Sequence, residues 1–317
     1  MMLLKRLAAT TVACSLAGGA LAAEPVTASI GGYLNIGIAY QNNDTPGAPS
    51  DEIGVLRDGE IHFKFEGTAD NGLTFDGRVE LEAFTTGDQI DENWARISSP
   101  WGSIKVGSDD DASDEFEFGI IEAPSTIIGY FDSDRSILES SNGDDTPTIF
   151  YETPTFLGGL AAMMSYAPQA GLDGATDTAL AFGDEPKWAI GAGYERVYNG
   201  ISFGLGGGYF DHENGPKAWQ LGGMVGYRGA SLGVHFDEDG TGTFSTLAVG
   251  VQYETGPWTV AGGWTTALDG PGLNNWGLWA TYALAPGVTT TLGYEGNDDK
   301  SVAGFDTTVI GYMRIGF

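Results

Sequence analysis

Residues 30–40 read Ile-Gly-Gly-Tyr-Leu-Asn-Ile-Gly-Ile-Ala-Tyr, with apolar side chains at nearly every even position and small or polar residues at most odd positions. Side chains of a β-strand alternate between two faces, so this stretch predicts a strand with one apolar and one polar face. The same period recurs along the chain, and counting the segments predicts about sixteen strands. The clearest repeats are Ile61/Phe63/Phe65, Phe75/Val79/Leu81, Trp188/Ile190/Ala192/Tyr194, Leu232/Val234/Phe236, Leu247/Val249/Val251/Tyr253, Trp276/Leu278/Ala280/Tyr282 and Val309/Met313/Ile315/Phe317.

The connections between these segments alternate in length. Short turns are expected at Ala69–Gly72, Pro100–Gly102, Pro154–Leu157, Arg228–Ala230, Glu254–Pro257 and Ala283–Gly287. Longer acidic loops are expected at Gln41–Gly54, Thr85–Asp91, Pro168–Asp184, Thr266–Asn274 and Gly296–Gly304, and the longest runs from Asp109 to Pro147. Short turns at one end and long loops at the other are typical of an outer-membrane barrel. The pattern therefore predicts an all-β fold, a sixteen-stranded antiparallel transmembrane β-barrel.

Aromatic residues on the apolar face distinguish a membrane barrel from a soluble β-sandwich. They lie at the ends of the predicted strands, while the middle positions hold aliphatic residues and glycine; examples are Tyr194, Tyr253 and Tyr282, which close their segments, and Trp188 and Trp258, which open theirs. Amphipathic rings prefer the level of the lipid headgroups, so two girdles around an aliphatic band favour a bilayer. A soluble or lipid-anchored secreted β-domain that binds carbohydrate is the alternative; it explains the aromatics but not the girdles.

The composition excludes several classes of protein. The 317 residues include 43 acidic and 14 basic side chains, which give a formal charge of −29, and an acidic chain repels nucleic acid. Aromatics make up 12%, which argues against intrinsic disorder. No apolar run after the first two dozen residues approaches the roughly 18 residues of a membrane helix.

The N-terminus has the three parts of a secretory signal. Lys5 and Arg6 precede a run of small and apolar residues, and Ala20-Leu21-Ala22 supplies a cleavage site. We expect a signal peptide over residues 1–22 and a single barrel domain over 23–317. The one cysteine, Cys14, lies inside this segment, so the exported chain has no disulfide; a lipidated Cys14 is the alternative, with a poor preceding motif.

Four segments carry a resemblance to a known family. The final strand ends in Phe317 after alternating apolar residues, and Tyr151-Glu152-Thr153-Pro154-Thr155-Phe156-Leu157-Gly158 is similar to a turn of the pattern Tyr-x-Ser-Pro-x-Phe-x-Gly, with Thr153 in place of serine. Residues 67–73 and 101–107 add a first short turn and a strand entering a third loop. Together they resemble the Gram-negative general porins of the alphaproteobacterial, Rhodobacter type.

The resemblance implies a barrel in the outer membrane of a Gram-negative bacterium, in contact with lipid and lipopolysaccharide, and usually a homotrimer. It further implies that the third loop, residues 109–147, folds into the lumen as a constriction. Phe317 resembles the signal that the barrel assembly machinery recognises. The implied function is a water-filled channel for passive diffusion of ions and small hydrophilic solutes, with no catalysis.

If the apolar face of each strand meets lipid, the residues of opposite parity, on the polar face, are expected to face the lumen. Lys64, Arg78, Arg96 and Lys105 are expected to form a basic wall on four successive strands. The acidic side of the constriction is expected from Asp109, Asp110, Asp111, Asp114, Glu115, Glu117 and Glu122. Opposed charges across a narrow gap create a transverse field, and net acidity predicts a preference for cations. The alternative is a solvated rim of local charge pairs that contribute little individually.

Other candidate sites are weaker. Asp109, Asp111 and Asp114 offer oxygen ligands for Ca²⁺, although the spacing lacks the EF-hand pattern, and no cofactor is required. The inward aromatics Tyr33, Trp94 and Trp279 suggest a sugar path but are scattered. Two further patterns would indicate a hydrolase or a histidine metal site, but their context does not fit. Ser202 in Gly-Ile-Ser-Phe-Gly begins a strand rather than a nucleophile elbow, and His62, His212 and His235 are too dispersed for a histidine metal site.

Overall fold

The structure, a computed structural model, describes residues 23–42, 52–84, 89–121, 146–168, 186–213, 215, 217–240, 245–269, 274–297 and 307–317. The expected signal peptide and the predicted lumen residue Glu122 lie outside these ranges. Sixteen strands are present, as the alternation predicts: β1 Glu24–Asn42, β2 Glu52–Thr68, β3 Thr74–Glu82, β4 Ile90–Ser99, β5 Gly102–Ser108, β6 Pro147–Glu152, β7 Leu160–Ala167, β8 Lys187–Tyr198, β9 Ile201–His212, β10 Lys217–Tyr227, β11 Ala230–Asp239, β12 Ser245–Thr255, β13 Trp258–Ala267, β14 Asn274–Ala285, β15 Val288–Asn297 and β16 Thr307–Gly316.

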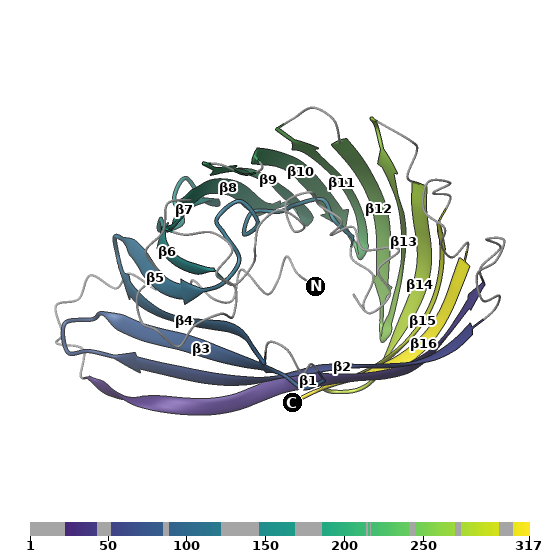
Figure 1. The fold of residues 1–317 in the computed structure, drawn as a ribbon, viewed down its shortest axis with the longest axis horizontal. Helices are drawn as coiled ribbons and strands as arrows, with labels where there is room; N and C mark the ends of the chain where they lie inside the picture. Colours follow the sequence, from purple (N-terminus) through teal and green to yellow (C-terminus); the bar gives the residue numbers. More distant parts are fainter. Residues whose placement is uncertain are drawn as a thin grey trace.

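The strands form one closed antiparallel barrel in which each strand pairs with its neighbours in sequence. Closure joins the two ends of the chain, because β1 pairs with β2 on one side and with β16 on the other (Figure 1). Ile36 lies opposite Met313, and the backbone of Phe317 exchanges two hydrogen bonds of 3.1 Å with Gly32. Closure leaves no free sheet edge, so the backbone groups of the strands are paired within the barrel.

The apolar parity predicted from the sequence is the outer face of the barrel. Ile38 on β1 and Leu278 on β14 are 61% and 57% exposed. Aromatic residues on this face pair between neighbouring strands near the strand ends, as Trp258 does with Tyr282 at 4.7 Å between ring centroids and Trp276 with Tyr294 at 5.1 Å. A closed barrel with an exposed apolar band and aromatic borders has the surface that a bilayer requires. In the described ranges, we find no helix with the length and apolarity needed to cross a membrane.

The short turns lie where glycine and turn residues predict them. Between β6 and β7, Leu157 and Gly158 have φ values of 50° and 76°, and Phe156 N–H donates to Leu160 O at 2.8 Å. Between β10 and β11, Arg228 has a φ of 49° and Gly229 one of 86°, which is the left-handed conformation of a tight hairpin turn. These turns fix the register of the hairpins, and with it the face on which each charged residue lies.

Candidate functional site: the charged inner wall

The predicted basic residues lie together on the inner parity of β2–β5. The register places Lys64 directly opposite Arg78, and Arg96 directly opposite Lys105. Their outward neighbours are apolar, as with Phe63 beside Lys64. The sheet therefore gathers four cations into one patch of wall.

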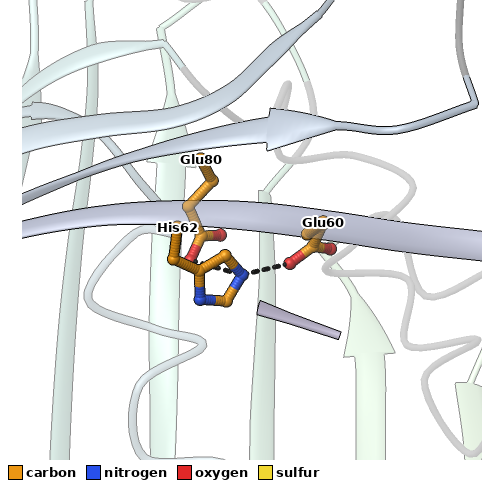
Figure 2. A group of neighbouring side chains, drawn as sticks. All are labelled: Glu60, His62 and Glu80. Atoms are coloured by element: carbon orange, nitrogen blue, oxygen red, sulfur yellow. Dashed lines mark hydrogen bonds and ion pairs between the residues drawn. The ribbon is translucent and has the colours of Figure 1, made fainter. Parts of the chain in front are cut away.

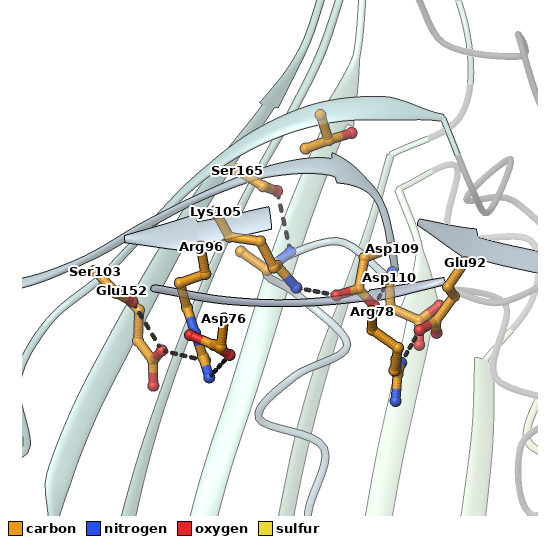
Figure 3. A network of polar contacts seen from close by, with 12 residues as sticks. Asp76, Arg78, Glu92, Arg96, Ser103, Lys105, Asp109, Asp110, Glu152 and Ser165 are labelled. Carbon is orange, nitrogen blue, oxygen red and sulfur yellow. Dashed lines mark hydrogen bonds and ion pairs between the residues drawn. The ribbon is translucent and has the colours of Figure 1, made fainter. Parts of the chain in front are cut away.

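Three cations of this patch, Arg78, Arg96 and Lys105, meet carboxylates of the wall or of the start of the third loop (Figure 3). Arg96 lies opposite Asp76 in the register and forms a fork of two hydrogen bonds, Nε to Oδ1 at 3.1 Å and Nη2 to Oδ2 at 2.7 Å. Glu152 lies 3.8 Å from the same guanidinium and accepts a hydrogen bond from Ser103. Two-point contacts between guanidinium and carboxylate are geometrically specific, so Arg96 is held against the wall.

Arg78 and Lys105 are paired in the same way. Arg78 forms an ion pair with Glu92, and Lys105 pairs with Asp109 at the start of the third loop (Figure 3). Arg78 also forms an ion pair of 3.0 Å with Glu80. The indole of Trp94 lies among the cations, with the charged groups of Arg78, Arg96 and Lys105 between 5.4 and 5.7 Å from its ring centre. Cations over an aromatic face are stabilised by the ring quadrupole, so Trp94 helps to hold the basic patch in place.

The described part of the third loop, residues 109–121, lies along the inner faces of β7–β12 and is anchored by residues outside the predicted pore residues. Lys187 on β8 forms an ion pair of 2.7 Å with Asp111, and Gln220 on β10 donates to Ser113 O at 2.6 Å. His235 Nδ1 on β11 lies 3.0 Å from Phe118 O. The two ends of this segment therefore touch different strands: Asp109 meets β5, and the chain then runs from β7 at Ala112 to β12 at Ile121.

Glycines of the inner wall leave the room for this segment. A Cβ added to Gly193 would lie 2.7 Å from Phe118 Cε2, and one added to Gly204 would lie 2.6 Å from Phe118 Cδ1. A Cβ on Gly222 would overlap the carbonyl of Phe118. Further inner glycines that touch the loop are Gly191, Gly206, Gly208, Gly233 and Gly250. We call these eight residues on β8–β12 the glycine seat; Phe116 and Phe118 fill it and are each 6% exposed.

The remaining predicted acids are distributed around this segment. Asp110 is exposed, Asp114 and Glu115 are half-buried, and Glu117 Oε1 lies 3.5 Å from His235 Nε2. Among the described residues, the suggested Ca²⁺ ligands do not form a group with ligand atoms within 4.8 Å of one another, and Asp109 and Asp111 pair with different lysines. The Ca²⁺ site stays a prediction without geometric support.

The inward aromatics do not form a continuous path. Trp279 is 3% exposed and packs with Ile121 and Ala261. Tyr33 is covered by the guanidinium of Arg314, 3.7 Å from its ring centre, and donates to Glu60 Oε1 at 2.7 Å. With Trp94 enclosed by cations, none of the three rings offers a free face next to another, as a sugar-binding path would require.

A closed sixteen-stranded barrel with an apolar outer face, a charged inner wall and a segment, residues 109–121, packed against that wall defines a transmembrane barrel of the channel-forming class. The sequence matches the family described as Gram-negative porin over residues 9–301, and the chain belongs to this family. It is thus a porin of the Gram-negative outer membrane, and members of this family are channels rather than enzymes.

Solved structures agree with this fold. A porin structure has 18% sequence identity and a TM-score of 0.64 over 92% of this chain and 100% of its own. A variant of the Rh. blastica porin has 17% identity and a TM-score of 0.66 with the same coverage. A loop-deletion mutant of OmpT, an outer membrane protein of Vibrio cholerae, has 12% identity and a TM-score of 0.65 over 93% of this chain and 100% of its own. No curated protein sequence matches the chain.

Proposed function

We propose that this porin is a cation-preferring channel that passes ions and small hydrophilic solutes by passive diffusion, and that it assembles as a homotrimer. The observation that supports the cation preference is the pairing of four basic side chains on the inner face of the barrel. Arg78, Arg96, Lys105 and Lys187 each lie against carboxylates, whereas the chain as a whole carries a large acidic surplus. Paired cations contribute little field at a distance, so the surplus carboxylates dominate the potential along the path.

The constriction in this proposal has two components. Lys64, Arg78, Arg96 and Lys105 form its basic side, and carboxylates of the third loop between Asp109 and Glu122 form its acidic side. The contact between Lys105 and Asp109 supports this arrangement, since it joins a wall cation to a loop carboxylate. The size limit then depends on the third loop, and a field between the two sides favours dipolar over bulky apolar solutes.

The test is single-channel current in a planar bilayer under a KCl gradient. Wild-type protein is expected to open in steps, three at a time for a trimer, with a reversal potential on the cation-selective side. Arg78→Gln combined with Arg96→Gln removes cations but leaves their carboxylate partners, so conductance and cation preference should both rise. Arg228→Asn, in an exposed turn, is the matched control and should change neither. Anion selectivity of the wild type, or an unchanged double variant, would overturn the charge assignment.

A further inference from the structure

A group of three potential metal ligands lies on the inner parity of β2 and β3 (Figure 2). Glu60 and His62 are two residues apart on β2 and therefore share a face, and His62 lies directly opposite Glu80 on β3. His62 Nε2 lies 2.7 Å from Glu60 Oε2 and 3.1 Å from Glu80 Oε1. The strand register holds these ligand atoms within 4.8 Å of one another, on rigid sheet rather than on a loop.

The single proton of His62 Nε2 cannot provide a hydrogen bond to both carboxylates. One imidazole nitrogen carries at most one proton, so His62 Nε2 can donate to only one of the two carboxylates. Glu80 is 4% exposed, and its Oε1 is buried without a hydrogen-bond partner among the described residues. Arg78 Nε lies 3.0 Å from this oxygen as an ion pair, without hydrogen-bond alignment. Buried carboxylate oxygens normally have aligned hydrogen-bond partners, so this oxygen, beside an imidazole nitrogen, lies where a metal ion could be coordinated.

The donor set indicates which cation fits. Ca²⁺ and Mg²⁺ prefer sites made of oxygen alone, whereas imidazole nitrogen suits Zn²⁺ and its neighbours in the transition series. Ligands bound to one tetrahedral Zn²⁺ at about 2.0–2.2 Å lie about 3.3–3.6 Å from one another. The present separations of 2.7 and 3.1 Å reach that range by small side-chain rotations. A fourth position then remains for water.

The surroundings support a dication at this place. Tyr33 donates to Glu60 Oε1 at 2.7 Å and orients the carboxylate from behind, as outer partners of metal ligands do. The nearest permanent cation, Arg78, is shared with Glu92. Ligand oxygens of Glu82 and Asp91 also lie within 4.8 Å of a Glu60 oxygen, so carboxylates outnumber cations in this part of the wall.

We propose that Glu60, His62 and Glu80 form a binding site for Zn²⁺ on the channel wall, and that the bound ion reduces current through the pore. The effect on current rests on the proposed channel function, whereas binding does not. The metal cancels carboxylate charge beside the path, and a cation-preferring current falls as that charge is removed.

Binding is tested first, by titrating ZnCl₂ into folded, detergent-solubilised protein in a calorimeter. We expect saturable binding by the wild type and at least tenfold weaker binding by His62→Ala and by Glu80→Gln. His212→Ala, which changes a histidine at the end of β9, is the matched control and should bind like the wild type. Heat-dependent gel migration confirms that each variant is folded. No binding by the wild type, or undiminished binding by both site variants, would overturn the proposal.

The current is tested second, in a planar bilayer with and without ZnCl₂. Conductance of the wild type should fall in a saturable way at the concentrations that calorimetry gives, and conductance of His62→Ala should stay constant. Equal inhibition of both proteins would refute the effect on current. If the protein binds Zn²⁺ in the calorimeter but opens no channels, the proposed function fails while the metal site stands; channels without Zn²⁺ binding give the reverse result.

Discussion

Replacing Phe118 with alanine tests whether the glycine seat holds the third loop inside the barrel. The ring is 6% exposed, and its neighbours on the wall are glycines, which have no side chains to move into the space. Truncation of a buried phenylalanine costs about 3–5 kcal/mol, and a wall that cannot collapse places this site at the upper end. The ion pair of Asp111 with Lys187 and the hydrogen bond from Gln220 to Ser113 remain, so the segment should loosen without leaving the wall altogether.

The expected effect is local. If the free energy of local opening of the segment falls by about 3 kcal/mol, amide exchange in residues 112–121 should accelerate about 100-fold, since 1.4 kcal/mol corresponds to a factor of ten. Hydrogen–deuterium exchange followed by mass spectrometry measures this, with the amide of Ala112, bonded to Ser165 Oγ at 3.0 Å, as one reporter. Phe156→Ala, an exposed phenylalanine in a short turn, is the matched control. Exchange that is equal in Phe118→Ala and wild type would show that the seat does not fix the loop.

Three further perturbations follow from the same geometry. Gly222→Ala adds a methyl group that overlaps the loop backbone and should lower stability by about 1–3 kcal/mol. The expected result is faster amide exchange in the loop and noisier single-channel current. The control is Gly223→Ala on the outer parity, where the added Cβ would lie 3.5 Å from its nearest neighbours, and it should leave both readouts unchanged. Lys187→Met leaves the buried carboxylate of Asp111 without its ion-pair partner and should shift the reversal potential further toward cation selectivity. Asp111→Asn should shift the reversal potential in the opposite direction. Shifts of the same sign and size in the two variants would contradict the pairing. Leu278→Arg places a charge in the middle of the outer apolar band and should cost about 2–4 kcal/mol, measured as a lower temperature of heat-modified gel migration.

The barrel itself is predictable from the sequence because its determinants are local. Period-two alternation assigns each residue to a face, as for Leu278 outside and Trp279 inside, and both assignments agree with the structure. Turn residues with left-handed backbone, such as Asn199 and Gly200, separate strands at the short-turn end. Both signals lie within a few residues of one another, so neither depends on the path of the chain elsewhere.

The seat of the third loop is harder to predict because it depends on contacts between distant segments. Gln220 and His235 lie 107 and 117 residues from their partners in the loop. Excess glycine predicts bent strands and close packing in general, but it does not by itself say what packs there. One signal was nevertheless present: glycines repeat on the inner parity of adjacent strands, as at Gly191 and Gly193 on β8 and Gly204, Gly206 and Gly208 on β9. Such a run marks a wall that another backbone approaches closely.

For the charged residues too, the sequence predicts the face on which each lies, but the partner of each depends on contacts between strands. Parity alone directs Arg96 and Asp76 into the lumen, but only the register shows that they lie opposite each other and form a two-point ion pair. A basic wall inferred from one strand at a time therefore overestimates the positive potential, because each cation counts at full strength. The register of β2 with β3 likewise brings His62 opposite Glu80, whose buried Oε1 has ion-pair contacts but no aligned hydrogen bond among the described residues. Both kinds of position depend on strand register, and an ion from solution has most to contribute where a buried carboxylate oxygen has no aligned hydrogen bond.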